Sequence, residues 1–352
     1  MAAPSTSAFV RTLLVMPNWV GDCVMALPVV EALAAADRQV VALAKRHLTP
    51  LLRLAPAVSD VVERGADDAE TIARLRAAGC DEAVVLPNSI RSAWLPYRAR
   101  IPWRWGYTGG WRAPLLRPPV PRPRELRGRG RRPQVEDYRE LLDALSAPPP
   151  TSWVPRLPRD RALLATGAER LARARLQGDG PLVGLFAGAE WGPSKRWPWR
   201  RFAELALALR RQVPGARIAV LAGPKEVWTA VRIHEESGKV HPVIGPDLDL
   251  GGLAAVLAHL DLLVTIDSGP MHLAAALGVR CVALFGPTDP RRTAPAGDGH
   301  VVLDRHLWCS PCFRRHCPLL HHRCLRDIGV DAVAAAAVAT LATRDSGGAP
   351  SP

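Results

Sequence analysis

Short apolar runs alternate along the first half of the chain with segments whose apolar residues recur at helical spacing. The run 11–16 predicts a buried strand, and 24–36 predicts the helix that follows it. Further strands are expected over 39–44, 58–62 and 83–86. Strands that alternate with helices are typical of α/β units around a parallel sheet, so we expect one sheet with helices on both faces.

A second series of the same kind begins at Leu182. The pattern predicts strands over 182–186, 217–221, 240–244, 262–266 and 281–285. It predicts intervening helices near 199–212, 226–236, 250–259 and 270–277. The chain is therefore expected to form two doubly wound, Rossmann-like domains facing a central cleft, with ligands bound outside the carboxyl ends of the strands.

The segment between the two series lacks this periodicity. Residues 96–133 carry Pro and Arg in place of a regular pattern, and a helical stretch over 135–145 is followed by Pro148-Pro149-Pro150. We expect a first domain over 1–165, a linker over 166–180, a second domain over 181–328, and a C-terminal helix and tail over 329–352.

Composition excludes a wholly disordered or fibrous chain, since 48% of the 352 residues are hydrophobic and 22% are charged. The net charge of +13 is local: residues 91–132 contain 12 arginines against the single acid Glu125. Three interpretations of this segment stay open. With Trp94, Trp103, Trp105 and Trp111 it could meet a polyanionic acceptor at a membrane, it could bind nucleic acid, or it could be a solvated loop.

The seven cysteines are an odd number, so a secreted disulfide framework is not expected. No secretory apolar region is evident near the first residues. The longest uncharged apolar run, 332–343, has 12 residues, which is short of the roughly 18 to 20 that a spanning helix needs. A soluble, cytoplasmic protein is expected.

Asp22 is the one carboxylate in the loop after the first strand, residues 16–23. This loop lacks the Gly-x-Gly-x-x-Gly spacing of a dinucleotide site. Two roles are open for Asp22: an N-cap of the following helix, or a general base at the cleft.

The segment 265–272 offers a second site, because a buried strand enters a Ser-Gly-Pro turn and then a helix. Pro270 suits the first helical position, and Gly269 permits close approach of a ligand to the backbone. Backbone N–H groups at Ser268, Gly269 and Met271 would form an anion site, while an ordinary strand-to-helix turn is the alternative.

The loop 188–198 also lies between a strand and a helix. Lys195 and Arg196 could neutralise a diphosphate, and three tryptophans, at 191, 197 and 199, favour a binding role over a solvated loop. Glu226 follows the neighbouring strand and could bind ribose hydroxyls, or could be a first-turn helix acid.

Four cysteines, Cys309, Cys312, Cys317 and Cys324, lie close together in the sequence with three histidines nearby. These ligand types suit zinc, but the spacing matches no standard finger, so a structural zinc and reduced thiols both stay open.

Taken together, these segments resemble glycosyltransferase family 9, the ADP-heptose:lipopolysaccharide heptosyltransferases. The resemblance covers about residues 11–328 and rests on Asn-Trp-Val-Gly-Asp at 18–22, Glu-Trp-Gly-Pro-Ser-Lys-Arg-Trp-Pro at 190–198, Asp-Ser-Gly-Pro-Met-His at 267–272, Phe-Gly-Pro-Thr-Asp-Pro at 285–290 and the Cys-rich run. Within the family these forms are most similar to the members that add the second heptose. The Arg- and Pro-dense stretch 114–133 is more basic than is usual there.

The resemblance implies a GT-B fold and an inverting transfer in which Asp22 is the general base and Lys195 stabilises the leaving diphosphate. It implies donor contacts from Glu190, Trp191, Lys195, Arg196, Glu226, Asp267, Ser268, Gly269, Pro270, Met271 and His272. We assign acceptor contacts to Asn18, Trp19, Asn88, Ser89, Arg91 and Arg104. No metal or other cofactor is expected beyond the donor ADP-heptose.

The expected partners are ADP-heptose, the heptosyl-Kdo2-lipid A acceptor and the inner face of the cytoplasmic membrane, without nucleic acid. Two alternatives remain: a first-heptose or other family 9 transferase with a different acceptor, or a non-catalytic nucleotide- or polyanion-binding protein on the same fold.

Overall fold

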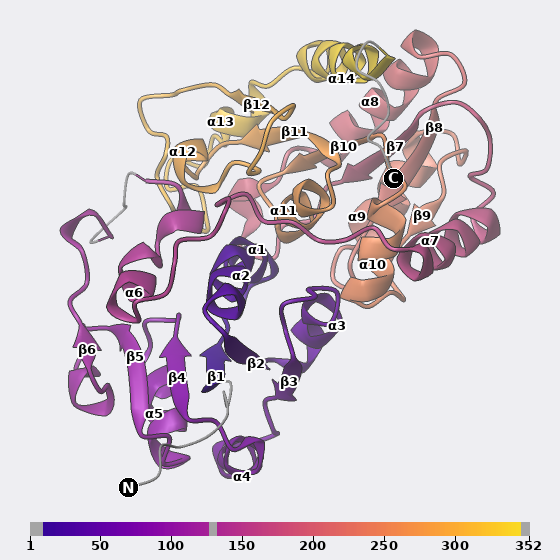
Figure 1. Ribbon diagram of the computed structural model, residues 1–352. Coiled ribbons are helices and arrows are strands. Elements are labelled where there is room, and N and C mark those ends of the chain that lie inside the picture. Colours follow the sequence, from indigo (N-terminus) through magenta and orange to yellow (C-terminus); the bar gives the residue numbers. More distant parts are fainter. Residues whose placement is uncertain (1–9, 127–131, 346–352) are drawn as a thin grey trace, which may run out of the picture. The chain divides into compact units, whose positions relative to one another are not determined.

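The computed structural model describes residues 10–126 and 132–345, and the chain divides into two compact units, Met1–Pro155 and Arg156–Pro352 (Figure 1). Each unit is a parallel six-stranded sheet covered by helices, which confirms the α/β class. The division lies at Pro155, where the sequence suggested residue 165. Helix α7 (Arg161–Arg173), which overlaps the expected linker, packs on α10 (Leu250–Leu257) in the second unit.

The sheet of the N-terminal unit has the strand order β3-β2-β1-β4-β5-β6, with every neighbouring pair parallel. Its strands are β1 (Val10–Val15), β2 (Arg38–Ala44), β3 (Asp60–Glu63), β4 (Glu82–Val85), β5 (Trp103–Tyr107) and β6 (Pro119–Val120). Strands β2 and β3 therefore lie on one side of β1, and β4, β5 and β6 lie on its other side.

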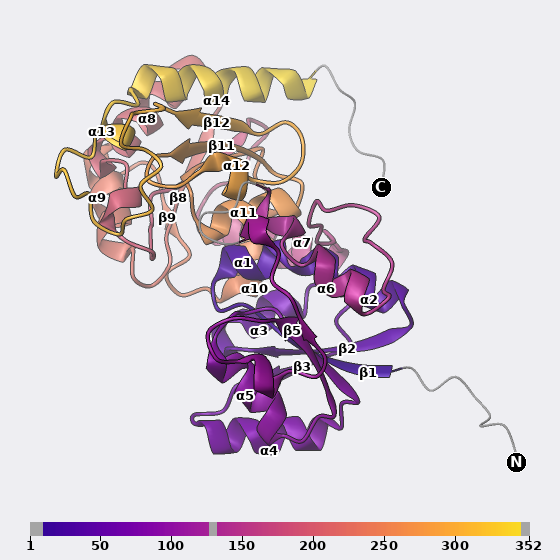
Figure 2. The same cartoon turned by 90° about the vertical axis from the view of Figure 1, so that its left-hand side faces the viewer.

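Helices cover both faces of this sheet, and Figure 2 shows α4 and α5 on one side of the strands and α2 and α6 on the other. The α-helices are α1 (Val20–Met25), α2 (Leu27–Ala35), α3 (Thr49–Leu52), α4 (Asp68–Ala78), α5 (Ile90–Arg98) and α6 (Arg139–Ala144). Short 3-10 turns are η1 (Arg46–Leu48), η2 (Ala113–Leu115), η3 (Arg124–Leu126) and η4 (Gln134–Glu136).

Three sequence-based expectations for this unit were wrong in detail. The segment 96–133, where no strand was expected, contains β5 and β6. These strands were missed because they are short and rich in Trp, Arg and Pro, and so lack the apolar run that marks a buried strand. The helix expected over 24–36 is two helices that meet at Ala26, with Pro28 in the first turn of α2. The helix expected over 135–145 is η4 followed by α6.

The sheet of the C-terminal unit has the order β12-β11-β10-β7-β8-β9 and is also parallel throughout. Its strands are β7 (Leu182–Phe186), β8 (Arg217–Leu221), β9 (Val243–Ile244), β10 (Leu262–Ile266), β11 (Arg280–Phe285) and β12 (Val301–Asp304). The sequence did not indicate β12, and β9 begins only after Pro242, which lacks the N–H that a strand interior needs.

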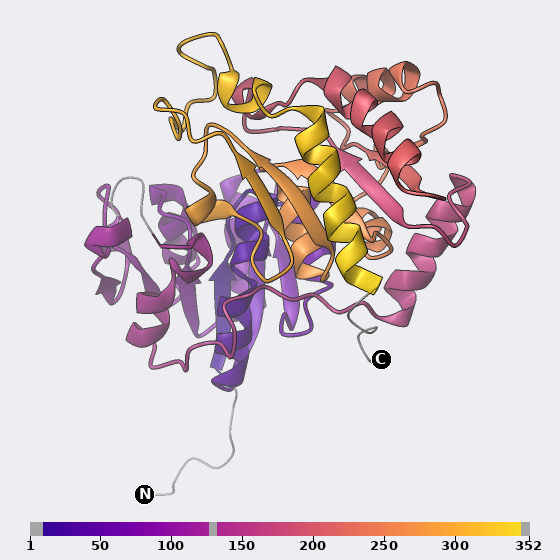
Figure 3. The same ribbon diagram turned by 90° about the horizontal axis from the view of Figure 1, so that it is seen from above.

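On one face of this sheet lie α8, α9 and α14, and on the other lie α7, α10 and α11; Figure 3 shows α14 running alongside the sheet. The remaining helices are α8 (Trp199–Gln212), α9 (Val227–Glu236), α11 (Gly269–Ala276), α12 (Pro290–Thr293), α13 (Arg323–Arg326) and α14 (Val330–Asp345), with η5 at Pro193–Lys195. None of the helices in the described parts of the chain is long and apolar enough to span a bilayer.

Both sheets place their first and fourth strands side by side, as β1 and β4 or as β7 and β10. The loops after those two strands leave the carboxyl edge in opposite directions, which opens a crevice where ligands bind in such sheets. The loops that matter are therefore those after β1 and β4, and those after β7 and β10.

Candidate functional site

Asp22 stands at the crevice of the N-terminal unit, in the first turn of α1 directly after β1. The N-cap of this helix is Trp19, which makes no side-chain capping bond, so the N-cap role considered for Asp22 is wrong. The Gln134 amide Nε2 donates to Asp22 Oδ1 at 2.9 Å. This bond orients the Asp22 carboxylate at the crevice.

Asn18 and Trp19 lie between β1 and α1, just before Asp22, and Asn88 and Ser89 follow β4, the strand beside β1. The structure thus brings four of the six acceptor candidates to one crevice. Ser89 has a structural task as well, because it caps α5 by accepting from Ser92 N at 3.2 Å.

Arg112 is a residue of this crevice that the sequence did not single out among its neighbouring arginines. Its side chain is 0% exposed, and Nη1 donates to the Pro87 carbonyl oxygen, which also accepts from Ser92 Oγ. Burial lowers the pKa of Arg112 to about 10. Arg112 therefore fixes the start of the loop that carries Asn88.

The last two acceptor candidates lie elsewhere. Arg91, near the start of α5, pairs with Asp68 at 2.5 Å, still at the carboxyl edge of the sheet. Arg104 lies near the amino end of β5, where it donates to the Leu115 and Ile101 carbonyls. The structure does not bring Arg104 to the other acceptor candidates.

Lys195 and Asp267 meet at the crevice of the C-terminal unit, although 72 residues separate them. Lys195, from the loop after β7, contacts Asp267 Oδ2 at 2.5 Å. Thr288 Oγ1, from the loop after β11, donates to the same oxygen at 2.6 Å. Asp267 is thus a buried carboxylate that holds an ammonium group at the carboxyl edge of the sheet.

Helix α11 begins beside this pair, with Ser268 as its N-cap and Pro270 in its first turn. The Ser268 side chain makes no capping bond, so backbone N–H groups at the start of the helix keep their capacity for an anion. His272 lies behind, and burial lowers its pKa to about 4, so it is neutral at pH 7. Met271 is fully buried and contributes packing together with its backbone.

A second cluster of charged side chains in the C-terminal unit is centred on Glu226, the residue before α9. A Cβ at Gly188 would lie 2.3 Å from Glu226 Cγ, and one at Gly223 would lie 2.7 Å from Glu226 Oε2, so both glycines make room for this side chain. Burial raises the pKa of Glu226, and the negative charge of Glu190 raises it further. The Glu226 side chain therefore lies against the loop after β7, at Gly188, and the loop after β8, at Gly223.

The other residues of the 188–198 loop divide between the site and the core. Trp191 lies under Lys195, with Nζ 5.2 Å from the ring centroid, and Lys225 pairs with Glu190. Arg196 is exposed and acts electrostatically on Glu226. Trp197 is buried and donates to the Ile328 carbonyl at 3.0 Å, so its presence in the loop reflects packing and not ligand binding.

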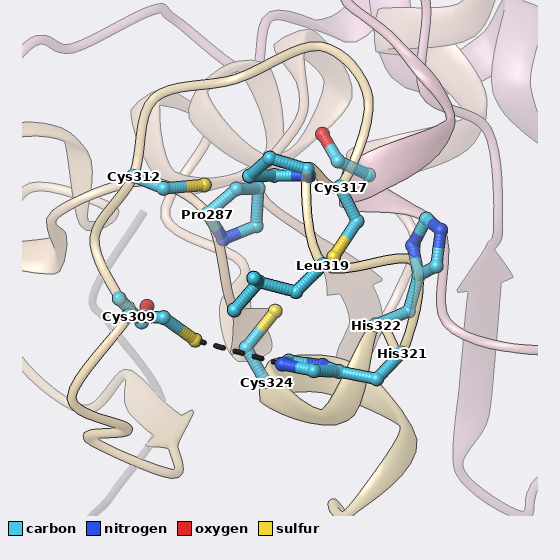
Figure 4. Close-up of a pocket in the computed structure, with 11 residues that line it drawn as sticks. Pro287, Cys309, Cys312, Cys317, Leu319, His321, His322 and Cys324 are labelled. Atoms are coloured by element: carbon cyan, nitrogen blue, oxygen red, sulfur yellow. Dashed lines mark hydrogen bonds between the residues drawn. The ribbon is translucent and has the colours of Figure 1, made fainter.

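The four clustered cysteines line one pocket with His321 and His322 (Figure 4). Their thiols lie around Leu319, and Cys309 Sγ lies 4.0 Å from His321 Nε2. None of the four forms a disulfide bond. Within residues 10–126 and 132–345, no group of three or more His, Cys, Asp or Glu side chains is arranged to hold a metal ion.

Comparisons with known proteins identify the family of this chain. A family model described as glycosyltransferase family 9 (heptosyltransferase) matches residues 69–322. Lipooligosaccharide heptosyltransferase 2 of Haemophilus influenzae is 31% identical over 83% of this chain and 87% of its own length. Lipopolysaccharide heptosyltransferase 2 of Escherichia coli is 30% identical over 81% of this chain and 85% of its own.

A solved structure of E. coli ADP-heptose LPS heptosyltransferase II superposes with a TM-score of 0.80 at 28% identity, covering 95% of this chain and 99% of that one. The chain belongs to glycosyltransferase family 9, the heptosyltransferases.

Proposed function

We propose that the protein transfers heptose from ADP-heptose to the inner-core heptose of lipopolysaccharide. One observation carries the proposal: Asp267 holds the Lys195 ammonium group beside the start of α11. The chain is also similar over most of its length to proteins named heptosyltransferase 2. An ammonium group next to free backbone N–H groups is suited to the diphosphate of a nucleotide sugar.

Asp22 is proposed as the general base of a single inverting displacement. Its carboxylate accepts the proton of the acceptor hydroxyl while that oxygen forms a bond to the anomeric carbon of the heptose. The bond from this carbon to the diphosphate breaks, and its electron pair leaves on the phosphate oxygen of ADP. The bond from Gln134 sets which face of the Asp22 carboxylate meets the hydroxyl.

Lys195 is proposed to stabilise the negative charge that develops on the leaving diphosphate. Asp267 and Thr288 hold the ammonium group in place before the donor arrives, so little reorganisation is needed during the reaction. Glu226 is proposed to accept hydrogen bonds from the ribose hydroxyls. With these groups in place we expect transfer to proceed without a divalent metal, and EDTA to leave the rate unchanged.

The test is ADP release from ADP-heptose with three acceptors: heptosyl-Kdo2-lipid A, Kdo2-lipid A, and none. We expect release only with the mono-heptosylated acceptor. Release with Kdo2-lipid A alone would identify a first-heptose transferase. Binding of ADP without release on any acceptor would identify a non-catalytic nucleotide-binding protein and refute the proposal.

We further propose that the enzyme works peripherally at the cytoplasmic face of the membrane, where its lipid-linked acceptor lies. An aromatic–arginine patch in the N-terminal unit supports this: Arg98 stacks on Trp94 at 5.4 Å, Arg104 on Tyr97 at 5.4 Å and Arg117 on Trp103 at 5.5 Å. Tyr97 is 46% and Trp103 49% exposed. Aromatic rings beside arginines suit an anionic lipid surface.

This patch lies at the amino end of β5, whereas Asp22 follows the carboxyl end of β1 in the same sheet. The separation is about one strand length, roughly 16 Å for five residues. Because sugars separate the acceptor heptose from the acyl chains, the patch and the reacting hydroxyl need not coincide.

Sedimentation with phosphatidylglycerol vesicles tests the patch. We expect the Trp103→Ser/Arg117→Ser variant to lose most vesicle binding while keeping its ADP affinity. The matched control is Trp228→Ser/Arg232→Ser in the C-terminal unit, where the Trp is 63% exposed and the Arg stacks on it at 5.5 Å. Equal losses in both variants, or binding of RNA in place of vesicles, would refute the membrane role.

A further inference from the structure

The thiol-lined pocket is formed mainly by residues 305–322, a segment that we call the Cys-rich loop, together with Cys324 of α13. Nothing in the proposed reaction uses its side chains. The loop nevertheless contacts both of the segments that hold Asp267, namely the loop with Lys195 and the loop with Thr288. These contacts give the Cys-rich loop a mechanical connection to the donor site.

On the Lys195 side, the connection runs through the preceding residue, Ser194, which is 2% exposed. Its backbone N–H donates to the Arg315 carbonyl at 3.1 Å, and its Oγ donates to the Arg314 carbonyl at 2.5 Å. Gly192 packs so closely that a Cβ there would lie 2.6 Å from the Arg315 carbonyl oxygen. The backbone around Lys195 is thus fixed by the Cys-rich loop at two adjacent points.

On the Thr288 side, the Phe313 backbone N–H donates to the Pro287 carbonyl at 2.7 Å. Ser310 Oγ donates to the Gly286 carbonyl. Both bonds lie immediately before Thr288, whose hydroxyl donates to Asp267. The Cys-rich loop therefore holds the second partner of Asp267 as well as the first.

We propose that the Cys-rich loop positions Lys195 and Thr288 around Asp267, and that Ser194 is a positioning residue for the leaving-group site. The contacts form a closed ring: Lys195 to Asp267, Asp267 to Thr288, the Thr288 loop to Phe313, and Arg314 back to Ser194. Release of one contact lets the ammonium group move away from the diphosphate. The proposal rests on the proposed function, in which Lys195 binds that diphosphate.

The Ser194→Ala variant tests the ring, because it removes the one hydrogen bond that this buried hydroxyl donates to the Cys-rich loop. We expect kcat to fall about five-fold, with the KM for the acceptor unchanged. ADP affinity should fall while adenosine affinity stays the same, since only ADP carries the diphosphate that Lys195 contacts. If the variant lost activity because it unfolded, the affinities for ADP and for adenosine would fall together. That result would overturn the proposal.

Gly192→Ala is the stronger perturbation, because its Cβ meets the rigid backbone of Arg315. The matched control is Gly329→Ala in the same unit, where a Cβ meets nothing within 4 Å. We expect Gly192→Ala to reduce kcat at least ten-fold and the control to have wild-type kcat. Wild-type activity in both Gly192→Ala and Ser194→Ala would overturn the proposal.

Thiol labelling supplies a readout besides activity. If the ring is closed, ADP bound at Lys195 restrains the Cys-rich loop, and by thermodynamic reciprocity the loop favours ADP. Iodoacetamide should therefore label the half-buried Cys309, Cys312 and Cys317 more slowly with ADP present, and Ser194→Ala should weaken that protection. Identical protection in both proteins would contradict the proposal. A Lys195→Ala variant with wild-type ADP affinity would instead refute the proposed function.

Discussion

The two units share one strand order, and each places an aspartate at its crevice, with different hydrogen-bond partners. Asp22 in the N-terminal unit receives a hydrogen bond from the Gln134 amide, whereas Asp267 in the C-terminal unit receives an ammonium group and a hydroxyl. We propose that the Asp22 carboxylate takes the proton of the acceptor hydroxyl, while Asp267 holds the cation that meets the leaving diphosphate. Two aspartates at matching crevices of one strand order are thus proposed to serve different steps of the reaction.

Replacing Asp22 with Asn should have the largest effect on transfer. The amide oxygen of Asn can still accept from Gln134, but it cannot take the proton of the acceptor hydroxyl. We expect kcat to fall by about 10²- to 10⁴-fold in a continuous assay of ADP release. Wild-type turnover would remove Asp22 from the role of base.

Replacing Lys195 with Ala should reduce kcat by about 10²- to 10³-fold, because charge on the leaving diphosphate is no longer stabilised. It also leaves the buried Asp267 without its cation, so thermal unfolding should shift to lower temperature. Lys195→Arg is the control that retains the charge and should recover part of the activity. Unchanged kinetics in the Ala variant would place the leaving group elsewhere.

Glu82 sharpens the contrast inside the N-terminal unit, because it is a buried acid at the amino end of β4, away from the crevice. It accepts from Thr12 at 2.7 Å and from Trp105 at 3.1 Å, and it pairs with Arg38 at 2.8 Å. Glu82→Ala should cost about 3 kcal/mol of unfolding free energy, measured by urea denaturation. The folded fraction should keep its kcat; a loss comparable to that of Asp22→Asn would contradict a structural role.

Glu226 should show the smallest effect, and it should depend on pH. Glu226→Gln is expected to weaken ADP binding about ten-fold, because the ribose hydroxyls lose a charged hydrogen-bond acceptor. Because the pKa of Glu226 is raised, its carboxylate is protonated sooner as pH falls than an ordinary glutamate. ADP affinity should therefore decline toward acidic pH in the wild type and stay flatter in Glu226→Gln.

Continuous apolar runs were sufficient to predict the inner strands: β7, β8 and β10 have the bounds that the sequence suggested. Strands at or near the sheet edges, such as β5, β6 and β12, were missed because they are short and partly exposed, and so lack that run. Edge strands depend on pairing with a neighbour that is already in place, which a local pattern does not contain.

The candidate site also divides into residues that a local sequence pattern predicts and contacts that it does not. Asp267 directly follows β10, Lys195 lies in the connection after β7, and Asp22 lies in the first turn of the helix after β1. Their places at the carboxyl edge were predictable because each of these segments follows an apolar strand. Their partners were not, because the contacts span long stretches of sequence: 112 residues separate Gln134 from Asp22, and 120 separate Ser194 from Arg314. Such pairings are set by the packing of whole elements.

The division of labour between the two aspartates is tested most directly by one measurement, the affinity of ADP for the Asp22→Asn and Lys195→Ala variants by calorimetry. A base that acts only on the acceptor hydroxyl makes no contact with ADP, so Asp22→Asn should bind ADP as the wild type does. Lys195→Ala should bind it at least ten-fold more weakly. Equal losses in the two variants, or a loss only in Asp22→Asn, would contradict the account.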